Sequence, residues 1–547
     1  MLVVATFWPA LTFDFVRWDD DIGVTQNPLL TESFGWAWWG HLFDSGQALR
    51  FKPLHWLWFR GIHGAWGFNP VAWHGGNLVL HAGAAVLFFG LLRGLLPAAD
   101  SAAAVRRDLV VWMAAALWAV HPLRVEPVAW VTGSTYALTT CLLLLSFRCY
   151  LRAHAHPQAI SRNWLAAAWL LAVGAYASYP VGATYGLWLL AVDAWWLRIG
   201  PGSGLLATGR RRLAWAGKHA LFLLPAVATV ALTAWTRFQT PGIFGDAPSL
   251  ETVGIPIRIL AALASTGYLA GCVLWPVNLT PNMPPMSVTP TVVLQWALLA
   301  AGVLGLLFAA WCRRTVRPGP ALLCFGFAAL SLPCLGLTER PTWPVDRYSY
   351  LVQLVLFGGV AAWLNGKMDT RSRRARWWLV VAAAGLVAGA VAARTQLAIW
   401  QDSGTLFAHM VAHPRFADSP RQQGHVYVLW GYAEAANSRP AHAAELLEKA
   451  RKIYLAAIRS ALDLNDHEEA LKLMTHLEHH FGATAVTHRE KGAWHLRLGH
   501  RDEAINELRL ALALDAANAR AQALLRQAEE LPARNGISPG PVHPKSR

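Results

Sequence analysis

The stretch Phe15-Val16-Arg17-Trp18-Asp19-Asp20-Asp21-Ile22 places three consecutive carboxylates directly after an apolar run, Leu2 to Phe13, and Asn27-Pro28 closes it. Adjacent carboxylates repel one another and resist burial, so they require water, cations or a proton-donating substrate nearby. The simplest interpretation is a solvated loop at a helix end, because charge at a membrane boundary is common. The alternative is a functional site, and polar motifs further along the chain favour it.

The composition indicates a membrane protein with room for a second domain. The 547 residues are 55% hydrophobic and include 29 Trp, whose side chains favour the bilayer interface. The formal net charge of +15 would suggest nucleic acid in a soluble domain, but Lys and Arg here fall in short clusters between apolar segments. Such clusters are typical of topology signals, so nucleic acid is excluded as a partner.

Other sequence signals are weak. The six Cys lie in or beside apolar segments without metal-ligand spacing, which predicts neither a zinc site nor a disulfide framework. No basic region precedes the first apolar run, so no cleavable signal peptide is expected.

Hydropathy and the positive-inside rule predict eleven membrane crossings, with the N-terminus inside and everything after Arg394 outside. The predicted segments are 1–14, 73–96, 109–121, 130–150, 164–179, 181–197, 219–236, 291–311, 320–337, 348–365 and 377–394. Basic clusters are assigned to the inside, which places the Asp triplet outside. Ile255 to Trp275 is expected to be an interfacial or re-entrant helix, because a crossing there would move Arg313 and Arg314 outside.

The outer loops carry cations that suit a phosphate at the bilayer surface. The first loop holds Lys52, the second holds Arg124 with Glu126, and the last before the C-terminal region holds Arg347. Arg favours oxyanions through its planar fork of donors. Carboxylates, cations and Trp are therefore expected to converge on one face.

One helix face combines His74, Asn77 and His81, which are spaced i, i+3 and i+7. A polar seam between membrane helices explains this spacing at least as well as ligation does. No closed set of metal ligands is evident.

After Arg394 the chain becomes charged and Ala-rich with helical periodicity. Two units share a spacing of twelve between a Gly and an Ala and of seven between Ala residues, which is typical of 34-residue tetratricopeptide repeats. The small and apolar residues at these positions are Gly431, Ala443, Leu447 and Ala450, then Gly492, Gly499, Ala504, Leu508 and Ala511. Repeats of this kind present a groove for peptides or proteins, although self-association is an alternative. The Pro- and Gly-rich tail 533–547 is expected to be disordered.

The chain resembles bacterial membrane proteins related to the transmembrane and tetratricopeptide-repeat O-mannosyltransferases, within the GT-C class of polyprenyl-phosphate-dependent glycosyltransferases. Seven colinear motifs carry the resemblance over almost the whole chain. They are Phe15 to Asp21 with Asn27-Pro28; Lys52-Pro53-Leu54 with Trp56; Phe68-Asn69-Pro70 with His74, Asn77 and His81; His121 to Trp130; Leu274-Trp275-Pro276; Asp346 to Leu351; and Trp400 to Phe407. The chain departs from the family pattern at Ser134-Thr135-Tyr136, where relatives carry Arg-x-Asp, at Tyr179, where a Lys is expected, and at Arg17, which looks like one extra residue.

The resemblance implies an all-α architecture. It consists of a GT-C-type membrane domain over 1–396, with about eleven spans plus an interfacial helix, and a tetratricopeptide solenoid over 397–532. The implied activity is transfer of a sugar from a polyprenyl-phosphate donor to an extracytoplasmic acceptor, with a protein hydroxyl favoured. The implied setting is a multi-pass protein of the bacterial inner membrane, with the active site and repeats outside and the acceptor held by the repeat groove.

The resemblance also assigns roles to residues. Asp19 or Asp20 is the catalytic base, and the other holds the acceptor or a divalent cation; metal dependence is open, because GT-C enzymes of both kinds exist. The donor phosphate is assigned to Arg347, Arg124 and Lys52, and Glu126 orients one of these cations. The supporting residues of the motifs are Asp346, Tyr348, His74 and Asn77.

Two alternatives to this function remain. A non-catalytic membrane-anchored repeat scaffold for envelope protein assembly is favoured by the missing Arg-x-Asp and opposed by the intact Asp triplet. A GT-C enzyme that modifies a glycan or a lipid is the second alternative, against which the repeats argue only by analogy.

Overall fold

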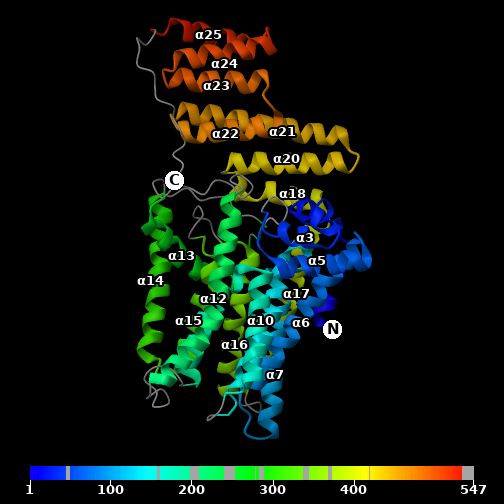
Figure 1. Ribbon diagram of the computed structural model, residues 1–547, viewed down its shortest axis with the longest axis vertical. Helices are drawn as coiled ribbons and strands as arrows, with labels where there is room; N and C mark the ends of the chain where they lie inside the picture. Colours follow the sequence, from blue (N-terminus) through cyan, green and yellow to red (C-terminus); the bar gives the residue numbers. More distant parts are fainter. Residues whose placement is uncertain are drawn as a thin grey trace. The chain divides into compact units, whose positions relative to one another are not determined.

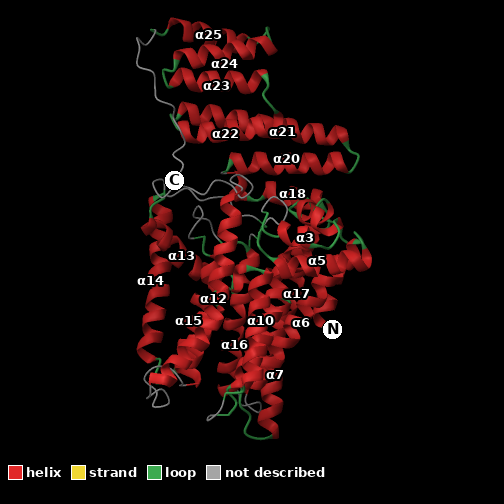
Figure 2. Cartoon of the chain, viewed as in Figure 1, coloured by secondary structure: helices red, strands yellow, loops and turns green. Residues whose placement is uncertain are grey.

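The computed structural model describes residues 1–44, 50–156, 160–197, 209–239, 253–277, 279–281, 289–336, 344–367, 373–417 and 419–532. Over these residues the chain is helical and contains no β-strand (Figure 2). The prediction of an all-α protein is confirmed. The chain divides into two compact units, Met1–His409 and Met410–Arg547.

Unit 1 consists of long apolar helices joined by short helical turns (Figure 1). Its α-helices are α1 (Leu2–Phe7), α2 (Pro28–Thr31), α3 (Trp36–His41), α5 (Pro53–Trp66), α6 (Pro70–Leu95), α7 (Ser101–Ala119), α8 (Val125–Ala129), α9 (Ser134–Ala153), α10 (Arg162–Ser178), α11 (Tyr185–Ala191), α12 (Gly209–Gln239), α13 (Ile255–Gly271), α14 (Pro290–Arg313), α15 (Pro318–Ser331), α16 (Ser349–Lys367) and α17 (Arg373–Leu397). The short turns that matter for the site are η1 (Trp8–Thr12), η2 (Asp21–Thr25), η3 (Pro122–Arg124), η4 (Val131–Gly133), η5 (Pro180–Gly182), η6 (Val192–Leu197), η9 (Asp346–Tyr348) and η10 (Ala398–Trp400).

Several helices of unit 1 are long and apolar enough to cross a bilayer. Within the described residues these are Pro70–Leu95, Val131–Ala153, Arg211–Thr236, Pro290–Arg313, Asp346–Lys367 and Trp377–Trp400. Shorter apolar helices cover Leu2–Thr12, Ile255–Gly271 and Pro318–Cys334. A multi-pass membrane protein is therefore confirmed, whereas the count of eleven crossings and the interfacial role of 255–275 stay predictions.

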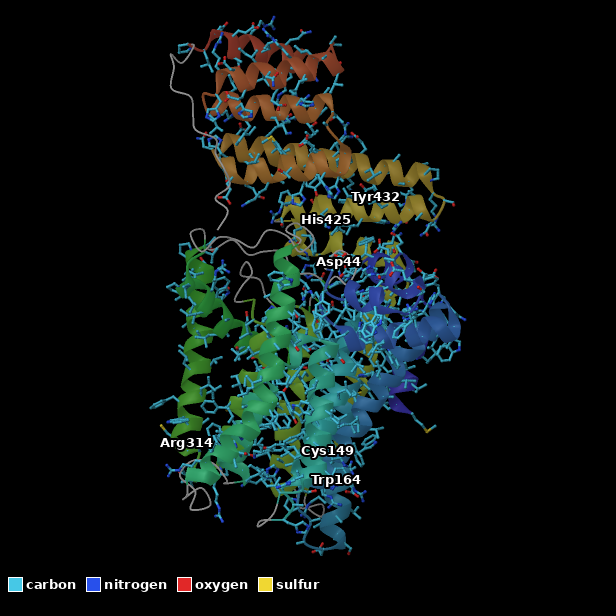
Figure 3. All side chains as sticks on the ribbon, in the orientation of Figure 1. Asp44, Cys149, Trp164, Arg314, His425 and Tyr432 are labelled. Carbon is cyan, nitrogen blue, oxygen red and sulfur yellow. The ribbon has the colours of Figure 1, made fainter. Side chains whose placement is uncertain are left out.

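The first loop and the predicted basic cluster lie toward different ends of unit 1. Figure 3 shows Asp44, from the first loop, at one end of the unit, and Cys149, Trp164 and Arg314 toward the other end. This separation is what the predicted sidedness requires of the first loop and the basic cluster at Arg313 and Arg314. The sidedness itself stays a prediction.

Helix packing brings the outer loops together. The helix α9 packs against α6 and α10, and α7 packs against α6 and α16. The segment between α7 and α9 folds into η3, α8 and η4, all of whose residues are buried. The η3 and α8 segments also contact η9 and α17. The short segment between α7 and α9 therefore packs against elements that are far away in the sequence.

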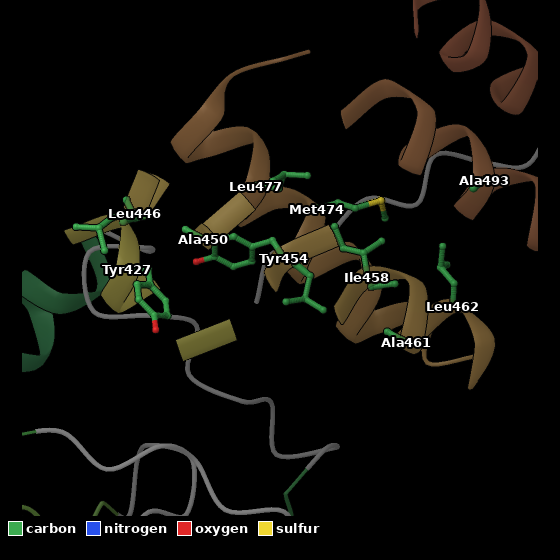
Figure 4. Packing of buried hydrophobic residues seen from close by; sticks show 13 residues of the cluster. Tyr427, Leu446, Ala450, Tyr454, Ile458, Ala461, Leu462, Met474, Leu477 and Ala493 are labelled. Atoms are coloured by element: carbon green, nitrogen blue, oxygen red, sulfur yellow. The ribbon is translucent and has the colours of Figure 1, made fainter. Parts of the chain in front are cut away.

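Unit 2 is a succession of helices in which each packs against the next (Figure 1). Its helices are α19 (Pro414–Ala417), α20 (Pro420–Ala436), α21 (Pro440–Asp463), α22 (His467–Phe481), α23 (Ala485–Arg497), α24 (Arg501–Leu514) and α25 (Ala519–Glu530), while α18 (Ser403–Ala412) crosses the boundary between the units. Apolar side chains such as Tyr454, Ile458 and Leu477 form its core (Figure 4).

Two glycines allow the close helix contacts of unit 2. A Cβ built at Gly431 would lie 2.8 Å from Leu447 Cγ, and one at Gly492 would lie 2.5 Å from Leu508 Cγ. Any side chain there would collide, so these positions select for Gly. The assignment of tetratricopeptide repeats, like the division at residues 396 and 532, stays a prediction, and the tail 533–547 lies outside the described residues.

Candidate functional site

The Asp triplet lies on a tight loop between η1 and α2. Asp19 has φ of 72°, a left-handed conformation that Asp and Asn tolerate better than most residues. Asn27 closes the loop, because its Nδ2 donates to the carbonyl of Ile22 (2.8 Å) and its Oδ1 accepts from the backbone N–H of Leu29 (3.0 Å). The loop therefore has a defined shape in which successive carboxylates face different surroundings.

Asp20 is fully buried and holds the loop to η4. Its Oδ1 accepts from the backbone N–H and the hydroxyl of Thr132, both at 3.0 Å, and its Oδ2 accepts from the backbone N–H of Val16 at 3.2 Å. Burial raises the pKa of Asp20 to about 7, against the opposing effect of these three donors. Three donors and full burial therefore make this carboxylate a fixed link between the loop and η4.

Asp19 has the opposite environment. The residue is exposed, and its carboxylate accepts no hydrogen bond from any residue that the structure describes. Desolvation by the surrounding protein raises the pKa of Asp19, although the side chain still contacts solvent. The nearby charges of Arg347, Lys52 and Arg50 lower its pKa. An accessible carboxylate facing three cations is suited to take up a proton beside an anionic leaving group.

Asp21 belongs to neither environment. Its Oδ2 pairs with Arg17 Nε at 3.3 Å, and both side chains are partly exposed. Such a pair contributes little to stability in water.

Arg347 is held beside Asp19 by Glu126. The guanidinium Nη1 pairs with Glu126 Oε1, and the backbone N–H of Arg347 donates to Glu126 Oε2 at 2.8 Å. Arg347 Nη1 also donates to the carbonyl of Pro281 (2.9 Å), and the guanidinium lies 5.2 Å from the Trp130 ring. The structure thus brings Glu126 of the second predicted outer loop together with Arg347 of the last one, as expected.

Lys52 lies at the start of α5 and is buried. Its ammonium group is 5.1 Å from the ring of Trp56, and burial lowers its pKa to about 8, with the charge of Arg50 adding to the effect. Its charge is therefore retained at neutral pH and lost under mildly alkaline conditions.

Arg124 occupies a different place from Arg347. It is fully buried, its Nη2 donates to Ser349 Oγ (2.7 Å) and Gln353 Oε1 (2.6 Å), and it lies between the rings of Trp118 and Tyr350. These contacts hold η3 to α16. The structure does not bring Arg124 to the exposed Asp19, and its assignment to the donor phosphate stays a prediction.

The His and Asn residues of α6 form a buried polar seam. Asn77 Nδ2 donates to the carbonyl of Trp130 (2.8 Å), and His81 lies 2.7 Å from Tyr350 Oη and 2.9 Å from the carbonyl of Ala119. The ring of His74 packs edge-on to Phe13 at 6.3 Å. Asn77 holds the turn that precedes Thr132, while the two histidines contact other elements, which agrees with the seam interpretation.

Asp346 and Tyr348 lie on η9, on either side of Arg347. Asp346 is buried, and its backbone carbonyl accepts from Ser349 Oγ at 2.6 Å. The Tyr348 ring lies 5.5 Å from the guanidinium of Arg347. Both residues therefore shape the turn that presents Arg347.

Arg50, whose charge acts on Asp19, was absent from the predicted site, as were the two tyrosines Tyr179 and Tyr136. Arg50 donates through Nη1 to Tyr179 Oη (2.9 Å), and the Tyr179 ring lies 5.1 Å from that of Tyr136. The signal for the two tyrosines was present in the sequence, because both stand where the resembling family carries charged residues. No group of three or more His, Cys, Asp or Glu residues within the described ranges is arranged to hold a metal ion.

Comparison with known proteins gives partial matches. The chain is 29% identical to protein O-mannosyl-transferase TMTC2 of Mus musculus over 201 residues, which are 35% of this chain and 22% of that protein. It is 33% identical to TMTC4 of Homo sapiens over 151 residues (26% and 20%) and 34% identical to Tmtc1 of Drosophila melanogaster over 127 residues (23% and 13%).

The matched regions span 13% to 22% of the length of these curated relatives. No protein-family profile matches the chain, and no solved structure matches it. The matches confirm the resemblance stated from the motifs: over 23% to 35% of its length, this chain is similar to the protein O-mannosyl-transferases of the TMTC group.

Proposed function

We propose that this protein is an integral membrane glycosyltransferase that moves a sugar from a polyprenyl-phosphate donor to a protein hydroxyl. The observation that carries the proposal is the environment of Asp19, an exposed carboxylate without a hydrogen-bond donor among the described residues, facing the charges of Arg347, Lys52 and Arg50. The names of the relatives, protein O-mannosyl-transferases, support the same reaction class.

In the proposed reaction, the acceptor oxygen forms a bond to the anomeric carbon while the bond from that carbon to the phosphate oxygen breaks. The hydroxyl proton passes to Asp19, and the electron pair leaves with the lipid phosphate. Asp19 acts as the general base, a role that contributes roughly 10²- to 10⁴-fold in rate. Cations around the leaving phosphate stabilise its developing charge. Asp20, which is bonded to Thr132 and Val16, positions the loop rather than taking the proton.

The proposed location is the bacterial inner membrane, with Asp19 and the repeats on the extracytoplasmic side. Contacts within unit 1 support a shared side for the Asp loop and the end of the last apolar helix. The backbone N–H of Arg17 donates to Ser403 Oγ (2.9 Å), that of Asp14 donates to the carbonyl of Gln401 (3.1 Å), and the Trp130 and Trp400 rings stack at 6.3 Å. Unit 2 would then present its helices to an acceptor protein.

The test of the function uses the full chain in nanodiscs with polyprenyl-phosphate mannose and a Ser/Thr-rich acceptor peptide. We expect a mass increase of one hexose on the peptide and release of polyprenyl phosphate. Envelope glycoproteins compared with and without the gene give the cellular counterpart. Unchanged glycans in cells, together with no transfer in vitro from a panel of lipid-linked sugars, would favour a non-catalytic scaffold. Transfer to lipid or oligosaccharide acceptors alone would favour an enzyme that modifies a glycan or a lipid.

A further inference from the structure

A buried tyrosine lies between two others at the edge of the candidate site. The Tyr136 ring, at the start of α9, is 5.1 Å from the ring of Tyr179 and 6.4 Å from that of Tyr348. Tyr136 is only 3% exposed, whereas its two neighbours are half-buried. Tyr179 comes from the turn between α10 and η5, and Tyr348 comes from η9. One rigid ring therefore sets the distance between two separate loops.

Each of the two half-buried tyrosines, Tyr179 and Tyr348, lies beside an arginine. The guanidinium of Arg50 lies 5.9 Å from the Tyr179 ring and donates to its hydroxyl. The guanidinium of Arg347 lies 5.5 Å from the Tyr348 ring and is fixed by Glu126. Aromatic contacts of this kind orient a guanidinium without neutralising it.

Both arginines act on the same carboxylate, that of Asp19. The charges of Arg347 and Arg50, together with Lys52, are the cations that bear on Asp19. Arg124, by contrast, is enclosed by Trp118, Tyr350, Ser349 and Gln353 and lies outside this group. The two arginines that share the carboxylate's surroundings are thus those that the tyrosines position.

We infer that Arg50 and Arg347 form a two-arginine clamp for the phosphate of the lipid-linked donor, with Tyr136 as the positioning residue that sets their separation. This inference rests on the proposed function and extends it, since it names a phosphate-binding residue and the device that places it. Two guanidinium groups from separate segments of the chain suit a tetrahedral oxyanion, which accepts several charge-assisted hydrogen bonds at once.

The test measures binding of undecaprenyl phosphate, undecaprenol and inorganic phosphate to the full chain in nanodiscs. For Arg50→Gln we expect affinity for undecaprenyl phosphate to fall about tenfold to hundredfold, as for loss of a hydrogen bond to a charged group, with undecaprenol binding unchanged. Arg314→Gln, the same charge change toward the other end of unit 1, is the matched control and should leave all three affinities unchanged. Tighter binding of the lipid phosphate than of inorganic phosphate identifies the lipid as the source of the anion.

Tyr136 is tested by two substitutions. Tyr136→Phe keeps the spacing ring and should retain the affinity for undecaprenyl phosphate, whereas Tyr136→Leu removes the spacer and should weaken it about as much as Arg50→Gln. In the transfer assay, these losses should appear in the KM for the donor and not in the KM for the acceptor. A general structural defect would weaken undecaprenol binding and raise both KM values together.

The clamp is refuted if Arg50→Gln binds undecaprenyl phosphate as tightly as the unmodified protein, or if it loses undecaprenol equally. Transfer activity with an unchanged donor KM in Arg50→Gln would reject the clamp and leave the proposed function standing. Arg50-dependent binding of undecaprenyl phosphate without any sugar transfer would support the clamp and reject the function.

Discussion

Two carboxylates in unit 1, Asp19 and Asp193, both have basic side chains nearby but differ in burial and hydrogen bonding. Asp193, in η6, is fully buried; it accepts from Tyr150 Oη (2.6 Å), Trp215 Nε1 (3.1 Å) and Lys218 Nζ, and His219 Nε2 lies 2.8 Å away. Asp19 is exposed and accepts no hydrogen bond from the described residues, while its cations lie around it. Saturated hydrogen bonding makes a carboxylate a structural anchor, whereas an accessible carboxylate among cations can accept a proton.

The two carboxylates also lie toward different ends of unit 1. Tyr150 follows Cys149 on α9, and Figure 3 places Cys149 toward the end of unit 1 opposite Asp44. The Asp193 cluster joins α9, η6 and α12 through hydrogen bonds to one buried carboxylate. We therefore expect substitutions at Asp193 to change stability and those at Asp19 to change chemistry.

The largest expected effect is on turnover. Asp19→Asn keeps the size of the side chain but removes its ability to accept a proton, so turnover should fall roughly 10²- to 10⁴-fold. Donor binding should change little, because cations hold the phosphate. The transfer assay with membrane levels checked in parallel measures this, and full activity of Asp19→Asn would end the proposed mechanism.

The next effect is on stability. Lys218→Met removes the ammonium that pairs with the buried Asp193 and leaves only His219 as a basic partner; breaking a buried pair costs about 3–5 kcal/mol. The melting temperature in detergent, followed by tryptophan fluorescence, should fall markedly. Lys452→Met is the control, because its pair with Glu448 is exposed and its loss should be undetectable. An unchanged melting temperature for Lys218→Met would show that the Asp193 cluster is not an anchor.

A smaller effect is expected from pH. The pKa of Lys52 is lowered to about 8, so its ammonium is charged below that pH and neutral above it. Donor affinity should therefore fall about tenfold between pH 7 and pH 9.5, the contribution of one hydrogen bond to a charged group. Lys52→Arg should move this loss to higher pH, because Arg stays charged. A donor KM that is flat over this range would remove Lys52 from the phosphate site.

The smallest effect is expected at Asp21. Its partly exposed pair with Arg17 contributes little, so Asp21→Asn should leave turnover and melting temperature within about twofold and one degree of the unmodified protein. A loss comparable to that of Asp19→Asn would mean that the triplet acts as one unit, and the contrast between neighbouring carboxylates would fail.

The proposed topology has a separate test. A reporter fused after residue 420 should be active only outside the cytoplasm, since the basic clusters place both the Asp triplet and the C-terminal helices outside. Activity confined to the cytoplasm would overturn that sidedness and the non-crossing assignment of 255–275.

The sequence by itself determined the all-helical membrane character, the position of the Asp loop after the first apolar run and the closure of that loop at Asn27. These follow from local patterns: hydropathy over about 20 residues, and turn chemistry over a few. It also predicted Glu126 and Arg347 as members of one site, because both belong to motifs of the resembling family.

Only the tertiary structure decided which members of the predicted set meet. Asp20 is buried because Thr132, 112 residues away, supplies its donors, and Arg50 meets Tyr179 across 129 residues. Arg124 and Arg347 are both arginines of outer loops, yet one is enclosed by Trp118 and Tyr350 while the other lies beside Asp19. The reason is that periodicity and charge report a residue's own helix or loop, whereas burial and partners depend on how helices far apart in sequence pack.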